Sequence, residues 1–202
     1  PRMCYINKLD NIGADFYKSF ESITEHLSEK ATPISLPIGL ENEFHGIVDL
    51  VKMKAFVHKD DEGKIIEEIE MSEDLKNKAI EYRTKLIEVV ADSDDDIATK
   101  YLEGEEITPE ELEIGVRKAT LSLKLFPVMA GSSLRNKGVQ EMLDNVCKYL
   151  PSPDDKSFTI EDKETREEKT YKGEVPGIDP KSEEIITRKL VDTEPFAALV
   201  FK

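Results

Sequence analysis

Two hydrophobic patterns follow one another along the chain and predict an α/β fold. Residues 2–6 are almost continuously apolar, which is typical of a short buried strand. Over residues 15–28, apolar side chains recur every three or four positions and predict a helix with one buried face. The same order returns later, where an apolar run at 125–131 precedes a helical pattern at 138–149. Each of these regions is therefore a strand, a loop and a helix, as in half of a βαβ unit.

The middle of the chain has a different pattern. Short β-branched runs between Pro33 and Glu70 are separated by Gly39, by Gly46 and by a charged turn at 59–64. Such runs, bounded by turn residues, are typical of antiparallel strands. We therefore expect a small sheet of three or four antiparallel strands here.

Three helices are expected after this sheet. Ser72 begins the first, because apolar residues recur at helical spacing after it. Ser93 and Asp96 are spaced like a capping box, which predicts a second, short helix. Thr108 precedes a proline at the first helical position, which predicts a third helix that runs to about Lys124.

These patterns divide the chain into five segments. Residues 1–28 and 124–150 form two parts of one α/β domain, and residues 29–123 form an α+β insertion between them. Residues 151–189 are dominated by Lys, Glu, Asp and Thr and predict an extended or partly disordered connector. Residues 190–202 begin a further domain with an apolar strand. Because the chain has no initiator methionine and begins almost within an apolar run, we expect it to be a piece of a longer protein.

The charge of the chain limits its partners. Its 202 residues carry a net charge of -15, a field that repels phosphate backbones and anionic lipid, so we expect no direct binding of nucleic acid or membranes. Residues 59–113 hold 20 acidic and 7 basic side chains, a net of -13, so the acidity belongs to the insertion. This concentration suggests a basic or helix-presenting protein partner, and its alternative explanation is a solvated helical surface.

The cysteines and histidines predict neither a disulfide nor a metal site. Cys4 and Cys147 are far apart in apolar contexts, which is typical of core thiols in a reducing compartment. The three histidines show no metal-ligand spacing with them, so no zinc site is expected. No signal peptide or apolar run of roughly 18 residues is found, which favours a cytoplasmic protein.

The first loop with specific chemistry is "NKLD", directly after the first predicted strand. The Asp10 carboxylate can accept two hydrogen bonds from adjacent donors, which guanine offers at N1 and at its 2-amino group and adenine does not. Asn7 can brace the loop and reach the N7 side of the base, while the Lys8 stem can lie flat against the ring. The alternative is a polar strand end, with Asp10 capping the next helix.

A second loop follows the strand at 125–131. Gly131, Ser132 and Ser133 are small residues, and their backbone amides can approach an acceptor such as guanine O6. A tight turn before a helix is the alternative explanation. Ligands of open α/β sheets bind outside the carboxyl ends of the strands, so both loops are expected at one edge of the sheet. Together they predict a guanine-recognition site.

The chain resembles the elongation factor G family, the ribosomal translocase GTPases. "NKLD" is similar to the family's guanine-specificity motif, and "GSSLRNKGVQ" to its second base-contacting loop. "PIGLENEFHGIVDLVKMKA" is similar to the opening of the family's G-prime insertion, and "YLPSP" and "EPFAALVFK" to the G-domain exit and the first strand of domain II. The resemblance implies a partial P-loop NTPase-type G domain of the α/β class, with an inserted α+β G-prime subdomain.

The resemblance also implies roles for the loop residues. Asp10 would fix the guanine edge with support from Asn7 and Lys8, and Ser132 with the Ser133 amide would face O6. The family commonly has alanine where Ser133 stands, and a contact made by the backbone amide should tolerate that change.

The implied activity belongs to a longer protein. It would be a GTP hydrolase that uses GTP and Mg²⁺ to move tRNA and mRNA through the ribosome, in the bacterial cytoplasm or an organelle matrix. The chain has no G-x-x-x-x-G-K-[ST] loop, so no Mg²⁺ site or catalytic residue is expected within it. We expect the isolated chain to hydrolyse no GTP and to bind guanine nucleotide weakly or not at all.

The resemblance implies a protein partner for the insertion as well. In the family, the C-terminal domain of the ribosomal stalk protein docks on the G-prime module. Glu88, Asp92 and Asp95 are spaced i, i+4 and i+7, which predicts one helix face that could take part in this docking. A solvated helix face is the alternative.

Two other functions remain possible on the sequence. A related translational GTPase of the release-factor-recycling type would share both loops and the insertion, although the stretch "VDLVKMKA" favours the translocase. A stand-alone acidic module that binds proteins would use "NKLD" only as loop chemistry. A phosphate-binding loop upstream of Pro1 would exclude that module.

Overall fold

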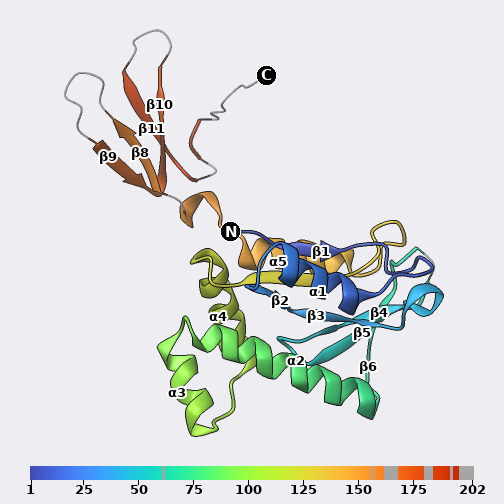
Figure 1. The fold of residues 1–202 in the computed structure, drawn as a ribbon. Helices are drawn as coiled ribbons and strands as arrows, with labels where there is room; N and C mark the ends of the chain where they lie inside the picture. The colour runs from blue at the N-terminus through green and yellow to red at the C-terminus, as the bar shows by residue number, and fades with distance from the viewer. Residues whose placement is uncertain (61, 156, 162–167, 180–183, 192, 196–202) are drawn as a thin grey trace. The chain divides into compact units, whose positions relative to one another are not determined.

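The computed structural model describes residues 1–60, 62–155, 157–161, 168–179, 184–191 and 193–195 (Figure 1). The chain separates into two compact units, Pro1–Leu150 and Pro151–Lys202, which are described one at a time.

The first unit contains a parallel three-stranded sheet in the order β1-β7-β2. Its strands are β1 (Cys4–Ile6), β2 (Ala31–Pro33) and β7 (Phe126–Ala130). Helix α1 (Phe16–His26) packs against β1 and β2, and α5 (Val139–Tyr149) follows β7. The two predicted strand–loop–helix regions are thus part of one α/β sheet, and the predicted fold class is confirmed.

Helix α1 begins where the sequence predicted. The Asp15 carboxylate accepts hydrogen bonds from the N–H groups of Tyr17 and Lys18, which satisfies two of the free donors of the first turn. Asp15 is therefore the N-cap residue. The alternative explanation of Asp10, a cap for this helix, does not hold.

The predicted boundary at residue 28 is too early for the sheet. Ala31–Pro33 form β2, and Ala31 pairs with Phe126 on the edge of β7 opposite to β1. All three residues of β2 are buried. The α/β sheet therefore continues to Pro33, into the segment that we expected to be insertion.

The insertion begins with an antiparallel sheet in the order β3-β4-β5-β6. Its strands are β3 (Ser35–Ile38), β4 (Gly46–Asp49), β5 (Lys54–His58) and β6 (Ile66–Ile69), with a short 3-10 helix η1 (Glu41–Glu43) between the first two. The expectation of three or four antiparallel strands is confirmed. The turn between β5 and β6 is the charged segment that the sequence predicted.

Three helices complete the insertion: α2 (Glu73–Ala91), α3 (Asp95–Glu103) and α4 (Pro109–Leu121). Ser72 caps α2 as predicted. Thr108 and Glu111 form a full capping box at the start of α4, because each side chain accepts a hydrogen bond from the other residue's backbone N–H.

The second helix starts differently from the prediction. Asp94, and not Ser93, is its N-cap, since the Asp94 carboxylate accepts from the N–H groups of Asp96 and Ile97. The same carboxylate lies 2.9 Å from the Lys118 ammonium on α4, and this hydrogen bond holds the pKa of Asp94 below its usual value. Asp94 is buried, so a side chain that the sequence pattern overlooked links two helices.

The insertion and the α/β sheet share one core. Buried residues of both belong to a single cluster, and α4 packs against α5. Arg83 on α2 makes its contacts within the inserted segment, where its guanidinium donates to the carbonyl oxygens of Leu50, Val51 and Ile107. The segment after β2 is therefore not packed separately from the parallel sheet.

The second unit contains two antiparallel hairpins where a connector was predicted. Strands β8 and β9 pair with one another, as do β10 and β11. Their bounds are β8 (Ser157–Glu161), β9 (Glu168–Lys172), β10 (Glu174–Ile178) and β11 (Ile185–Lys189), preceded by η2 (Pro153–Asp155). Most of the strand predicted for 190–202 lies outside the described residues.

Two further expectations concern thiols and membranes. Both cysteines are free, but Cys147 is exposed on α5 and is not a core thiol, because it lies on the outer face of an amphipathic helix. Cys4 is half-buried, and burial raises the pKa of its thiol. Within the described part of the chain, no helix is both long enough and apolar enough to cross a membrane.

Candidate functional site

The two predicted loops meet at the carboxyl ends of adjacent parallel strands. Ile6 at the end of β1 is in register with Ala130 at the end of β7. Beyond this pair, the N–H of Gly131 donates to the Ile6 carbonyl at 3.1 Å, and the N–H of Leu9 donates to the Gly131 carbonyl at 3.2 Å. The sheet therefore continues as backbone contacts between the loops.

Asn7 joins the two loops through one side-chain oxygen. Its Oδ1 accepts from the N–H of Lys8 at 2.8 Å, from the N–H of Ser133 at 2.9 Å and from the Ser133 hydroxyl at 3.0 Å. Asn7 thus has the bracing position that the sequence suggested. The Ser133 amide, which we expected to face guanine O6, is engaged by Asn7.

The first loop turns sharply at Lys8. Its φ of 64° lies in the left-handed region, which is uncommon for residues other than glycine. The Lys8 carbonyl accepts from the N–H of Asn11, and Leu9 is 1% exposed, so the turn is fixed to the core on its inner side. The Lys8 side chain itself is exposed and is available to cover one face of a ligand.

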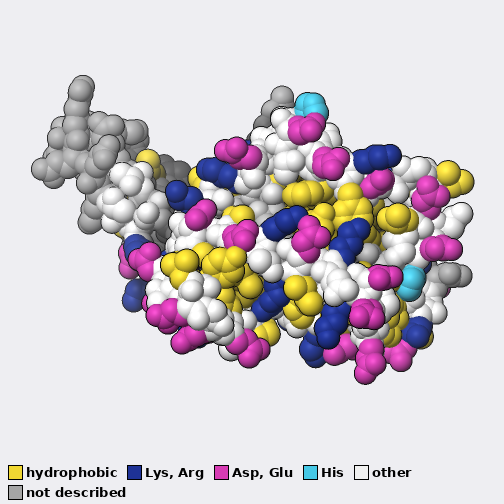
Figure 2. Space-filling model, turned by 60° about the horizontal axis from the view of Figure 1, so that its bottom comes forward, with side chains coloured by type: hydrophobic (Ala, Val, Ile, Leu, Met, Phe, Trp, Pro, Cys, Tyr) yellow, Lys and Arg dark blue, Asp and Glu magenta, His cyan; other side chains and the backbone are white. Residues whose placement is uncertain are grey.

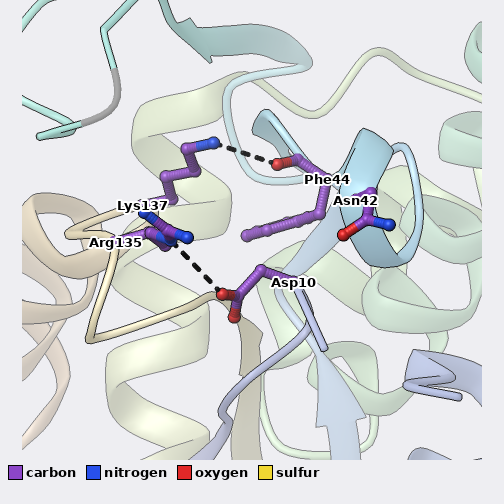
Figure 3. Close-up of a pocket in the computed structure, with 5 residues that line it drawn as sticks. All are labelled: Asp10, Asn42, Phe44, Arg135 and Lys137. Carbon is purple, nitrogen blue, oxygen red and sulfur yellow. Dashed lines mark hydrogen bonds and ion pairs between the residues drawn. The ribbon is translucent and has the colours of Figure 1, made fainter. Parts of the chain in front are cut away.

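Asp10 lies on the wall of a pocket of about 220 Å³. The other lining residues are Asn42, Phe44, Arg135 and Lys137 (Figure 3). The Asp10 carboxylate is 3.7 Å from Nε of Arg135, and the Lys137 ammonium donates to the Phe44 carbonyl at 3.2 Å. The Asp10 side chain is only 17% exposed, while that of Arg135 is 56% exposed. The pocket therefore combines both loops with the segment around η1.

The second loop is closed by Ser132 and Lys137. Their backbones exchange two hydrogen bonds, of 2.9 Å and 3.0 Å. Ser132 is fully buried, and its hydroxyl has no hydrogen-bond partner among the described residues. A buried hydroxyl without a partner is costly, so this group is suited to a bond that a ligand or a movement of the loop completes.

Gly131 lies against Tyr5 of β1. A Cβ atom at Gly131 would be 2.0 Å from the Tyr5 hydroxyl oxygen, so no larger residue fits without a shift. That hydroxyl donates to the Lys137 carbonyl at 3.2 Å. Burial, and next the charge of Glu141, raise the pKa of Tyr5 to about 12, which keeps the hydroxyl protonated at neutral pH.

Several of these residues were not predicted. Arg135 and Lys137 belong to the quoted second loop, but their charge gave no reason to place them beside Asp10 or Phe44. Asn42 and Phe44 come from the insertion, and no local pattern connects them with the loops. The signal for them is a contact between distant segments, which a single sequence does not contain.

The predicted partner-binding residues lie on different elements. Glu88 is on α2, Asp92 is the C-cap residue of that helix, and Asp95 begins α3. The prediction of one helix face is wrong, because α2 ends at Ala91 and a new helix begins at the Asp94 cap. All three side chains are exposed, and Glu88 accepts a hydrogen bond from Tyr101 at 2.8 Å.

The described residues form no group of three or more His, Cys, Asp or Glu side chains that could hold a metal ion. The carboxylate in the pocket is paired with a guanidinium instead. The pocket lining thus combines one carboxylate with a guanidinium and an ammonium group.

Two comparisons with known proteins fit this geometry. The family described as the elongation factor Tu GTP binding domain matches residues 1–152. A crystal structure of a protein from Thermus thermophilus is similar with a TM-score of 0.68 and 27% sequence identity, and the match covers 89% of this chain. The chain spans only 28% of that protein's length. From the family match over most of its length, the chain belongs to the family of elongation factor Tu GTP-binding domains, the G domains of translation-factor GTPases.

Proposed function

We propose that the chain is the rear part of the G domain of an elongation factor G, with its G-prime insertion and the beginning of domain II. The whole protein would use GTP to move tRNA and mRNA through the ribosome. The observation that carries the proposal is the junction of the two loops at Asn7, beyond the ends of β1 and β7. The stretch 48–55 supports the translocase among related GTPases.

Asp10 is the residue that selects guanine. Its carboxylate accepts from N1–H and from the 2-amino group, once it leaves its contact with Arg135 at 3.7 Å. Since Arg135 is more than half exposed, that ion pair is weak and its loss costs little. Two charge-assisted bonds from the base replace it.

The other loop residues hold the base in place. The exposed Lys8 stem covers one face of the ring, and Asn7 keeps the second loop against the first. The Ser133 N–H is shared between Asn7 and guanine O6 in a three-centred bond, with Ser132 behind it.

We assign this chain a role in recognition of the base and none in hydrolysis. Hydrolysis needs a phosphate loop and Mg²⁺, and neither the loop motif nor a metal-binding group is formed by the residues described here. The isolated chain is expected to hydrolyse no GTP.

Asp10→Asn in the full-length protein tests the guanine site. The amide can accept only one of the two bonds from guanine and presents an N–H₂ donor to the other, so GDP affinity should fall on the order of 100-fold. Xanthosine diphosphate, which has an oxygen in place of the 2-amino group, should gain affinity. Competition binding with GDP, xanthosine diphosphate and ADP measures both effects.

Asp15→Asn is the matched control. Asn is as good an N-cap as Asp, and Asp15 lies five residues further along, so its substitution should leave the preference for GDP unchanged. Equal binding of GDP and ADP by the wild-type protein would overturn the proposal. So would an Asp10→Asn protein with unchanged GDP affinity.

We also propose that Glu88, Asp92 and Asp95 take part in docking the C-terminal domain of the ribosomal stalk protein. Their exposure and the charge of their module support it. Figure 2 shows the side of the molecule that carries the inserted helices, with acidic side chains scattered among basic and apolar ones. The partner would therefore bring basic and apolar groups together.

Charge reversal tests this surface. Replacing the three acids by Lys should weaken binding of the stalk domain by at least ten-fold, measured by calorimetry. Reversal of Glu21, Glu25 and Glu29, exposed acids on and just after α1, changes the total charge equally and is the control. Unchanged binding of the triple variant would exclude these residues from the interface.

A further inference from the structure

The second base loop is held by a histidine of the inserted sheet. His58, at the end of β5, is 6% exposed. Its Nε2 accepts from the backbone N–H of Gly138 at 3.1 Å, and its Nδ1 lies 3.3 Å from the Gly63 carbonyl. A carbonyl oxygen can only accept, so Nδ1 carries the hydrogen and Nε2 offers its lone pair. The two contacts therefore select one neutral tautomer.

The turn between β5 and β6 reaches the same loop at a second point. The Gly63 carbonyl also accepts from the side-chain amides of Asn136 at 3.3 Å and of Gln140 at 3.1 Å. A Cβ atom at Gly63 would lie 2.5 Å from the Asn136 carbonyl oxygen and 2.6 Å from that of Arg135. The turn and the loop are thus in direct backbone contact.

These contacts add to the hydrogen bonds that the loop makes within itself. Within the loop, backbone bonds join Ser132 to Lys137 and Asn136 to Ser133. The segment that closes it, residues 136–138, is bonded to the insertion through Gly63, Phe44 and His58. The position of Ser133, which the first loop meets at Asn7, therefore depends on the inserted sheet.

We propose that His58 is a positioning residue for guanine recognition. Through Gly138 it holds the second loop where the Ser133 amide meets O6, so that the insertion sets the affinity for the base. The inference rests on the proposed function of the two loops. It gives the insertion a second role besides docking, because a partner that moves the β5–β6 turn would loosen the contact with O6.

Base analogues separate this role from a merely structural one. 6-thio-GDP keeps N1–H and the 2-amino group but presents a sulfur, a weaker acceptor, in place of O6. Inosine diphosphate keeps O6 and lacks the 2-amino group that Asp10 binds. In the full-length protein, His58→Leu should lower GDP affinity by about five- to ten-fold, as expected for one lost hydrogen bond. The ratio of GDP to 6-thio-GDP affinity should fall towards one, while the ratio of GDP to inosine diphosphate affinity stays as in the wild type.

Two companion variants sharpen the result. His58→Gln offers an amide oxygen to the Gly138 N–H and should restore most of the preference for GDP over 6-thio-GDP. His26→Leu removes an exposed histidine of α1 whose ring bonds to the Ser22 carbonyl in its own helix, and should change none of the ratios.

A variant that leaves His58 in place covers the case of a misfolded His58→Leu protein. Gly63→Ala should push the turn and the loop apart and reduce the same ratio. Gly104→Ala is its control, because Gly104 has a similar positive φ of 71° with nothing within 4 Å of the added Cβ.

The outcomes distinguish the two proposals. A wild-type protein that binds ADP as well as GDP overturns the proposed function. A wild-type protein that prefers GDP, with His58→Leu or Gly63→Ala weakening all three guanine-type nucleotides equally or none of them, overturns the role of His58. Selective loss of the discrimination at O6 supports it.

Discussion

The two loops at the carboxyl end of the parallel sheet are built in different ways. The first, residues 7–10, takes its shape largely from its own residues: Asn7 bonds to the next residue, Lys8 turns the chain, and Leu9 anchors it in the core. Its distant bonds, from Ser133 to Asn7 and from Leu9 to Gly131, all go to the second loop. The second, residues 131–138, is bonded to segments from far along the chain, among them Tyr5 in β1 and His58 at the end of β5. One loop is locally encoded, and the other is a product of the assembled fold.

This difference determines how each loop responds when other parts of the protein move. A loop held by its own residues changes little when distant parts move, whereas a loop held by the inserted sheet follows that sheet. Gly131 and Asn7 are the points at which the two kinds of loop are joined. Substitutions at these points show how far each loop depends on the other.

The largest effect is expected for Gly131→Ala. The added Cβ would lie 2.0 Å from the Tyr5 hydroxyl oxygen and 2.7 Å from the Lys137 carbonyl oxygen, so β1 and the second loop must move apart. The free energy of unfolding should fall by about 3 kcal/mol. Denaturant unfolding measures it, and Gly104→Ala, which has only backbone strain, should cost about 1 kcal/mol. Equal losses in the two variants would show that the contact with Tyr5 is not tight.

Asn7→Ala should have the next largest effect. It removes the acceptor of three hydrogen bonds, two of them from Ser133, and should lower the free energy of unfolding by about 1–2 kcal/mol. All three bonds are accepted by Oδ1, so Asn7→Asp, which keeps an oxygen there, should retain most of the stability. If Asp were as destabilising as Ala, the junction would not depend on that oxygen.

The sequence predicted those features whose cause is local. The capping box of Thr108 and Glu111 marked the start of α4, and Ser72 marked that of α2, because these residues satisfy the free N–H groups of their own helix. "NKLD" predicted a polar loop after a strand, because its polar residues follow directly on an apolar run.

What the sequence did not predict depends on distant contacts. β2 has only three residues and shows no pattern of its own, and its strand conformation comes from pairing with β7. The cap bonds of Asp94 are local, but Asp92, Asp95 and Asp96 stand beside it and offer no clear choice of cap, and its bond to Lys118 lies 24 residues away. The bonds of His58 to the second loop are equally remote in sequence.

The hairpins after residue 150 were missed for a different reason. Their strands are mostly polar, so composition suggested an extended connector. Cross-strand pairs decide instead, such as Thr159 and Thr170, whose hydroxyls lie 3.1 Å apart. Composition reports how much apolar surface is available but not which polar side chains face one another.

Tyr5→Phe should have the smallest effect at neutral pH and a distinctive dependence on pH. It removes one hydrogen bond, from the hydroxyl to the Lys137 carbonyl, and should cost about 1 kcal/mol. The folded protein raises the pKa of Tyr5 from 10.0 to about 12, so between these values the unfolded chain has lost this proton and the folded chain still holds it. Stability must therefore fall as the pH rises through this window.

Because phenylalanine has no such proton, the Tyr5→Phe protein lacks this part of the decline. The stability advantage of the wild type should be fully present below pH 10 and should shrink between pH 10 and about 12, as measured by urea unfolding at a series of pH values. Burial is the main cause of the raised pKa and the hydroxyl is bonded to the second loop, so the difference between the two proteins reports how tightly β1 holds that loop. Parallel curves for the two proteins across this window would mean that the loop leaves Tyr5 open to solvent, and that the insertion alone holds it.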